Sequence, residues 1–260
     1  MAINQSIRKA TSRVKSVHDA TSDKLFRVIQ KARQENNYAT IGKQRALLKT
    51  ISSILATYRE DVHDIIMDGV YEVSLQSEKS LAGGNGAPES TIVKHVLAHS
   101  DEMLGMYLDN YIMRVKIDMK KLLQMDFIAI QRKASFDGTS KGDAQRALLP
   151  EILANEPKML FMDSAGRKWL GSNYLWILTN TTLVSASLDT FLGVAADRGI
   201  TLARLSDSDS GYSCDKLSGM TVSLTEGGEH PYIGEFLRGG SREGELFHPR
   251  CSHYLIPYEA

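Results

Sequence analysis

The fold is decided by an apolar repeat that begins with the stretch Leu47-Leu-Lys-Thr-Ile-Ser-Ser-Ile-Leu-Ala-Thr-Tyr58. Its large apolar residues recur three and four positions apart, and the spacing continues through Val62, Ile65 and Ile66. Residues spaced in this way share one face of an α-helix, so the stretch predicts a long amphipathic helix with one buried side. Gly69 follows the repeat and is expected to end the helix.

Similar repeats flank this helix on both sides. Before it, a first helix is predicted by apolar residues that share one face: Ile3, Ile7, Ala10, Val14 and Val17. After it, residues 82–88 contain three glycines and a proline and read as a loop. A third long helix is then expected up to about residue 132. Five methionines lie in it, and we expect them in the core or in helix–helix contacts: Met103, Met106, Met113, Met119 and Met125.

The second half of the chain changes character. Residues 1–134 form the predicted helical region, and residues 135–157 are expected to be a linker with a short helix at 143–154. Beyond it, strands are predicted at 158–162, 200–205 and 220–224, with a helix at 172–197 that ends at Gly199. The expected fold class is α+β, predominantly α, in which residues 158–260 form a small α/β module with a loop-rich C-terminus.

The charge of the chain is divided by segment. Its 260 residues carry 31 Lys and Arg against 31 Asp and Glu, so the formal charge is zero. Residues 1–59 have 12 basic and 3 acidic residues, a net of +9, whereas residues 60–110 have 2 and 10, a net of −8. The composition therefore excludes a uniformly basic nucleic-acid binder and a disordered acidic chain, but it leaves room for a local cationic surface.

The basic residues of the first helix lie mostly off its apolar face. They form either a solvated helix side or a cationic arm that meets DNA or an acidic protein surface. A third alternative is that the acidic segment pairs with them inside one helical bundle. The candidate contacts to DNA or a partner are Arg8, Lys9, Arg13, Lys15, Lys24, Arg27, Lys31 and Arg33.

The sequence does not favour export or a membrane role. The N-terminus lacks the apolar core of a signal peptide. The longest uncharged stretch, residues 169–188, contains too many Asn, Thr and Ser for a bilayer span and is expected to be a largely buried helix. We therefore expect no membrane partner.

The C-terminal region contains a candidate zinc site. Cys214 lies upstream of the run His248-Pro-Arg-Cys251-Ser-His253. Two sulfur and two imidazole donors suit tetrahedral Zn²⁺, so Cys214, His248, Cys251 and His253 are the predicted ligands. Zinc would also hold a loop-rich segment that has little apolar material to fold around. The alternatives are buried thiols beside histidines bonded to the backbone, or a Cys214–Cys251 disulfide.

The sequence contains few other motifs for ion binding or catalysis. The run Ser206-Asp-Ser-Asp-Ser-Gly211 lacks the twelfth-position Glu of an EF-hand, because Ser218 stands there, so a solvated turn is expected. Cys251 beside His248 or His253 could form a nucleophile pair, but crowding on a proline-containing loop argues against it. Phosphate-binding glycine loops and His-Glu-x-x-His helices are absent from the sequence. An enzyme is therefore not expected.

Five motifs in the second half occur in a familiar order. The first is Phe161-Met-Asp-Ser-Ala-Gly-Arg-Lys-Trp169, followed by Tyr174 and Thr181. Next come Asp197-Arg-Gly-Ile-Thr-Leu-Ala-Arg-Leu-Ser206 and Cys214 with Gly219. The last is Leu246-Phe-His-Pro-Arg-Cys-Ser-His253 with Pro257-Tyr258. In order and spacing, residues 158–258 resemble the minor head proteins of tailed bacteriophages, of the phage Mu F type.

The resemblance implies a structural virion component that acts in head assembly. It implies a location in the virion, at the portal vertex or in the head interior, and in the host cytoplasm during assembly. The implied partners are the phage portal protein, the major capsid protein, packaged DNA and further copies of the chain. Two alternatives remain open: a DNA-associated protein ejected with the genome, and a metal-dependent enzyme or toxin-like module.

Overall fold

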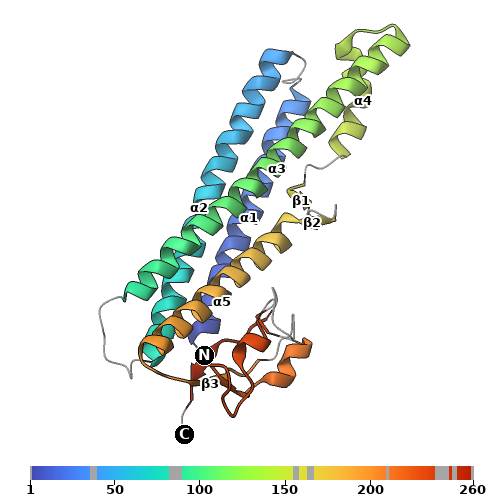
Figure 1. Ribbon diagram of the computed structural model, residues 1–260. Coiled ribbons are helices and arrows are strands. Elements are labelled where there is room, and N and C mark those ends of the chain that lie inside the picture. Colours follow the sequence, from blue (N-terminus) through green and yellow to red (C-terminus); the bar gives the residue numbers. More distant parts are fainter. Residues whose placement is uncertain are drawn as a thin grey trace. The chain divides into compact units, whose positions relative to one another are not determined.

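The computed structural model (Figure 1) describes residues 2–35, 40–81, 90–154, 158–162, 167–208, 211–237, 246–247 and 251–258. The helices in these residues are α1 (Ala2–Gln34), α2 (Ile41–Leu81), α3 (Thr91–Asp137), α4 (Lys141–Ala154) and α5 (Gly171–Asp197), with 3-10 turns η1 (Ser213–Leu217) and η2 (Ile233–Glu235). The strands are β1 (Leu160–Met162), β2 (Lys168–Leu170), β3 (Leu202–Leu205), β4 (Thr221–Ser223) and β5 (Leu255–Pro257). The predicted class, predominantly α with a small α/β module, is confirmed.

The chain divides into two compact units, each built from separate stretches. Unit 1 contains Met1–Val14, His63–Gly105 and Leu175–Ala260, and unit 2 contains Lys15–Val62 and Met106–Tyr174. The units differ in charge. Unit 2 carries 20 Lys and Arg against 13 Asp and Glu, a net of +7, whereas unit 1 carries 11 against 18, a net of −7.

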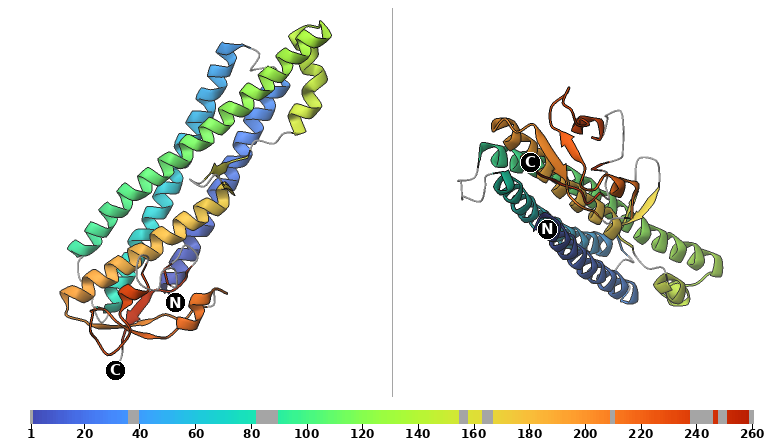
Figure 2. Two further views of the ribbon diagram at one scale, coloured as in Figure 1. Left: turned by 45° about the vertical axis from the view of Figure 1, so that its right-hand side comes forward. Right: turned by 90° about the horizontal axis from the view of Figure 1, so that it is seen from below.

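Unit 2 is a helical assembly. The parts of α1, α2 and α3 that belong to it run side by side (Figure 2), as their apolar faces require. Its core contains Leu25 and Ile29 of α1 together with Ile51 and Leu55 of α2 and Val115 of α3, each almost completely buried.

A buried ion pair crosses this helical core. Arg33 is 0% exposed, and its Nε donates to Asp126 Oδ2 at 2.9 Å. Gln145 of α4 donates to the carbonyl oxygen of Arg33 at 2.9 Å. Burial raises the pKa of Asp126, and the hydrogen bond and charge of Arg33 oppose that rise.

A second polar group in unit 2 is made of aromatic rings. His18 Nδ1 lies 2.9 Å from the Tyr58 hydroxyl, and the rings of Tyr111 and Tyr174 stack at 5.3 Å. Burial lowers the pKa of His18. Gly171, at the start of α5, passes so close to His18 and Tyr111 that a Cβ there would meet both side chains. The glycine is therefore required where β2 turns into α5.

In unit 1 the beginning of α1 pairs with the second half of α2. Lys9 Nζ lies 3.1 Å from Glu72 Oε1, and Arg13 Nη1 lies 3.6 Å from Asp68 Oδ2. Two cations of the basic segment are thus paired with the acidic segment, and within unit 2 Arg59 pairs with Asp109 at 3.0 Å. These three pairs agree with the alternative in which the acidic segment pairs with the basic one. Buried Ser77 of α2 also bonds Ser187 of α5 at 2.8 Å.

The small sheet of unit 1 has the order β4-β3-β5, and both pairings are antiparallel. Its register places Ala203 opposite Val222 on one side and Pro257 on the other. The sheet and its loops pack on α5 through one apolar cluster. Its buried members are Leu188, Phe191, Ala195, Ala203, Leu205, Cys214, Leu217, Val222, Ile233, Phe236, Leu246, Cys251 and Leu255.

Two predicted boundaries are wrong. Gly69 does not end the second helix, because α2 continues to Leu81. A Cβ on Gly69 would lie 2.9 Å from Leu183 Cδ2 and 3.2 Å from Ala10 Cβ, so this glycine permits close packing within unit 1. The linker expected from residue 135 is also shorter, because α3 reaches Asp137 and α4 begins at Lys141.

The other expected elements are largely found. The long helix ends as predicted before Gly199, whose φ of +66° suits glycine, and the strands at 200–205 and 220–224 appear as the shorter β3 and β4. The strand expected at 158–162 is reduced to β1, and it pairs with β2, which the sequence did not reveal. The last strand, β5, was also missed, because three residues in a Pro-rich ending give no alternation.

Candidate metal centre

Strand pairing brings two distant parts of the chain together. Ser206 follows β3 and Tyr254 precedes β5, and the two residues bond twice. The Ser206 N–H donates to the Tyr254 carbonyl at 2.9 Å, and the Tyr254 N–H donates to Ser206 Oγ at 3.1 Å. The chain leaving β3 carries η1 with Cys214, and the chain entering β5 carries Cys251 and His253. The antiparallel pair therefore sets these three side chains beside each other.

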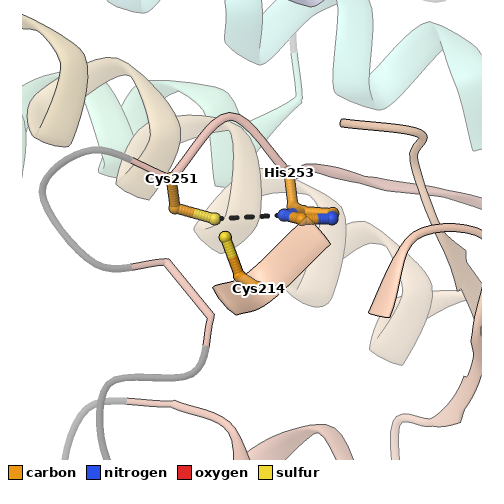
Figure 3. Close-up of side chains that lie close together, drawn as sticks. All are labelled: Cys214, Cys251 and His253. Atoms are coloured by element: carbon orange, nitrogen blue, oxygen red, sulfur yellow. Dashed lines mark hydrogen bonds between the residues drawn. The ribbon is translucent and has the colours of Figure 1, made fainter. Parts of the chain in front are cut away.

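Cys214, Cys251 and His253 form a compact cluster that could hold a metal ion. One donor atom from each lies within 4.8 Å of the others, and all three residues are 0% exposed. Figure 3 shows their side chains pointing toward one another, with Cys251 Sγ 3.3 Å from His253 Nδ1. No disulfide joins the two cysteines in this structure. His248, the fourth predicted ligand, lies outside the described residues.

The imidazole of His253 is oriented by Ser218. His253 Nε2 lies 3.2 Å from Ser218 Oγ, which also accepts from the Ser208 N–H at 3.1 Å. The Ser218 hydroxyl proton is directed at the Ser208 carbonyl at 3.4 Å. This pattern favours a proton on Nε2 and leaves the Nδ1 lone pair facing the sulfurs. A metal-binding histidine typically donates its remote N–H to a neighbour in this way.

Cys251 is held from α5. The side-chain amide of Asn180 donates to the Cys251 carbonyl at 3.2 Å. Burial raises the pKa of the Cys251 thiol to about 12, and nearby Cys214 adds to the rise. A completely buried thiol with a high pKa is a poor nucleophile at neutral pH, which disfavours the Cys–His nucleophile pair.

A polar shell surrounds the cluster. Asp215 of η1 accepts from the Gly211 N–H at 2.7 Å and from the Ser208 hydroxyl at 2.8 Å. Ser208 also lies 2.7 Å from Ser252 Oγ, so the shell joins the two chain segments that carry the cysteines. The Asp/Ser run predicted as a solvated turn thus contributes Ser208 to this shell.

The sequence predicted all three residues of the cluster, but it did not predict the residues that hydrogen-bond to them or to their backbone. Asn180 and Ser218 carry no motif of their own, and Ser208 lies in a run that was expected to be only a solvated turn. The roles of all three depend on the pairing of β3 with β5. Cys214 with Gly219 was the available signal, because Gly219 has a φ of +73° and its N–H bonds the Leu205 carbonyl at 3.1 Å. That turn directs the chain from η1 into β4.

The candidate DNA or partner residues fall into three groups. Lys9, Arg13, Lys15 and Lys31 form ion pairs with Glu72, Asp68, Asp19 and Glu35, respectively. Arg33 is buried against Asp126 and cannot reach a partner. Arg8, Lys24 and Arg27 are exposed on α1. The candidate set therefore does not form one uniform cationic arm.

Comparison with known proteins identifies no relative: no protein-family model, no curated protein and no solved structure matches the chain. A search of the described helices finds none with the length and apolar character needed to cross a bilayer.

Proposed function

We propose that this chain is a structural protein of a tailed-bacteriophage head, a minor head protein that contacts the portal or the major capsid protein, and that it is not an enzyme. The observation that carries the proposal is the convergence of Cys214 with Cys251 and His253. These residues belong to the last two of the five ordered motifs on which the resemblance depends, and they meet in one buried cluster. The meeting of two motifs that lie far apart in the sequence supports the resemblance, because unrelated motifs would have no reason to converge.

We further propose that the cluster holds zinc in a structural role. Two thiolates and an imidazole are the donors that Zn²⁺ takes in structural sites, and soft sulfur ligands disfavour Mg²⁺ and Ca²⁺. When bound, zinc would cross-link η1 to the chain before β5. The hydrogen bond between His253 Nε2 and Ser218 Oγ supports this assignment, because it leaves Nδ1 facing the two sulfurs.

Metal analysis tests the zinc proposal. We expect about one zinc per chain in protein purified without chelator, and loss of that zinc in Cys251→Ser and His253→Ala. His230→Ala is the matched control, because His230 lies in the same C-terminal region outside the cluster. Less than about 0.2 equivalents in the unmodified chain contradicts the proposal.

Particle analysis tests the virion proposal. We expect the chain in purified phage particles by mass spectrometry, and we expect antibody labelling at the portal vertex or, after opening the head, in its interior. A chain that remains in the soluble fraction and is absent from particles contradicts the structural role. Hydrolytic activity of the purified protein that disappears in folded His253→Ala would favour the metal-dependent enzyme instead.

Contact with packaged DNA is a second candidate function, and the charge of unit 2 favours it. Lys24 and Arg27 on α1, and Lys43, Arg45 and Lys49 on α2, form no ion pair with any described residue. These residues extend the predicted set into α2. Exposed cations that form no ion pair can neutralise DNA phosphates and release counterions.

Salt-dependent binding to duplex DNA tests this candidate. We expect affinity to fall steeply between low and physiological salt, and Lys24→Glu with Arg27→Glu to reduce the slope by about two. Lys9→Glu with Lys15→Glu is the matched control, since both lysines are already ion-paired. A flat salt response contradicts DNA binding. Deleting residues 1–59 is unsuitable here, because α1 and α2 supply the core of unit 2.

A further inference from the structure

Helix α3 displays a line of exposed apolar side chains within unit 2. Met106, Met113, Ile117 and Ile128 are 53, 51, 38 and 48% exposed, and we call them the α3 ridge. Their spacings of seven, four and eleven residues are each close to a whole number of helical turns. The side chains therefore form one nearly straight line about 33 Å long. The methionines expected in the core or in helix contacts are thus divided, since Met119 is buried and Met106 and Met113 face outward.

The ridge is narrow and has cations along both sides. Lys116 and Lys120 lie on one side of it and Arg114 and Lys121 on the other, about 50–90° around the helix. The acidic Asp109 on the lysine side is itself paired with Arg59 at 3.0 Å. None of the four cations forms an ion pair or hydrogen bond with any described residue. The intervening positions on the ridge line are uncharged, Asn110 and Gln124.

The width of the ridge favours a helix as its partner. A helix that lies in a membrane interface or faces a core presents one continuous apolar sector of about 100° or more. On α3, Arg114 and Lys121 lie between the ridge and the other exposed apolar side chains on that side, Tyr107 and Met125, so the apolar surface is interrupted. A single row of side chains fits the groove between rows on a facing helix. Methionine adapts its shape to such a groove.

The charges decide which helix fits. A second copy of α3 packed on the ridge would place Arg114 and Lys120 against cations of the same kind, which is unfavourable. DNA phosphates would satisfy the cations but would leave four apolar side chains unburied. A helix with an apolar row and flanking Asp or Glu satisfies both requirements at once.

We propose that the α3 ridge is a docking surface for an acidic amphipathic helix of another protein. The partner helix inserts apolar side chains between Met106 and Ile128, and its carboxylates pair with Arg114, Lys116, Lys120 and Lys121. This interaction surface lies wholly within unit 2 and does not depend on the virion role or on the metal centre.

A peptide-binding experiment on the full chain tests the proposal. The probe is a synthetic helix of about 25 residues with an apolar row flanked by glutamates, labelled for fluorescence anisotropy. We expect saturable binding that weakens at least about tenfold in Met113→Ser with Ile117→Ser, and again in Lys120→Glu with Lys121→Glu. The charge-reversed variant should instead prefer a probe with lysines in place of glutamates.

A matched control separates docking from general stickiness. Met125 is on the same helix and is 69% exposed, but it lies roughly 90° away from the ridge. Met125→Ser should therefore change the affinity by less than about twofold. Thermal unfolding of each variant checks that the fold is retained, which is expected because every altered side chain is exposed.

Three results would overturn the proposal. The first is no saturable binding of the acidic probe up to about 100 μM, or binding that the ridge variants leave unchanged. The second is binding to phosphatidylserine vesicles, but not to the probe, that the ridge variants abolish, which would assign the ridge to a membrane surface. The third is self-association of the chain that the ridge variants abolish.

Discussion

Unit 2 and the C-terminal part of unit 1 bury polar groups in different ways. In unit 2, long helices enclose the Arg33–Asp126 ion pair and the His18–Tyr58 hydrogen bond. Near the C-terminus, strands of three or four residues enclose two thiols and an imidazole.

The difference shows that backbone hydrogen bonding limits how many polar side chains a region can bury and still remain folded. A long helix satisfies its own backbone, so unit 2 can place a few polar side chains among apolar ones without losing its framework. Short strands and loops leave more backbone N–H and C=O groups without a backbone partner. In the C-terminal region, side chains such as Ser206, Ser218 and Asp215 therefore accept hydrogen bonds from backbone N–H groups. Perturbations of the two regions should therefore have separable effects.

The largest expected effect is in unit 2. Arg33→Ala leaves Asp126 buried without its cation, and we expect a loss of about 3–5 kcal/mol in the free energy of unfolding, measured by urea denaturation. Replacing both partners, Arg33→Met with Asp126→Leu, should stay within about 1 kcal/mol of the unmodified chain. A loss below about 1 kcal/mol for Arg33→Ala would mean that Asp126 is solvated.

The second effect belongs to unit 1. Cys251→Ser places a hydroxyl in a completely buried sulfur site, and we expect a loss of about 2–3 kcal/mol in the free energy of unfolding. Amide hydrogen exchange should accelerate in residues 202–258 and remain unchanged in the unit 2 parts of α1 and α2. Equal acceleration throughout the chain would contradict the separation of the two regions.

A smaller effect depends on pH. Burial lowers the pKa of His18 below its usual 6.5, so below about pH 6.5 the unfolded chain takes up a proton that the folded chain excludes. Stability should therefore fall as the pH is lowered through this range. His18→Gln keeps hydrogen-bonding groups without titrating, and its stability should change less with pH than that of the unmodified chain. An unchanged pH dependence of the stability in His18→Gln would contradict this assignment.

The smallest effect is that of the surface ion pairs. Lys9 and Glu72 are 3.1 Å apart, but their side chains are 59% and 38% exposed. A double-mutant cycle with Lys9→Ala and Glu72→Ala should give a coupling of about 0.2–1 kcal/mol that decreases with salt. A coupling above about 2 kcal/mol would contradict this prediction, because it would match a buried ion pair such as Arg33–Asp126.

The long helices were predictable because their signal is local. The apolar face from Leu47 to Ile66 follows the 3.6-residue period directly, and its residues Leu47, Ile51, Leu55, Val62 and Ile66 are buried. The prediction that Gly69 ends the helix was wrong because this glycine instead permits close packing against Leu183, more than 100 residues away. A glycine chosen for close packing has the same sequence signature as one that ends a helix.

For the candidate site, the sequence predicted the metal-binding residue types but not the residues that hold them in place. Cys214, Cys251 and His253 stand out as residue types, whereas Asn180 and Ser218 acquire roles only through the fold. Arg33 shows the opposite error. Its charge placed it among surface contacts, but its partner Asp126 is 93 residues away and no local pattern links the two.

The position of β3 at the centre of its sheet has a consequence for the timing of folding. Its partner β4 follows within about twenty residues, but β5 is synthesised some fifty residues later. Until then one edge of β3 has open backbone groups that another chain can pair with. The helices are by then already made, so α5 can offer the Asn180 amide before Cys251 arrives to accept from it. During translation the C-terminal region is therefore the last to acquire structure, and nascent chains that lose contact with α5 are the ones most exposed to aggregation.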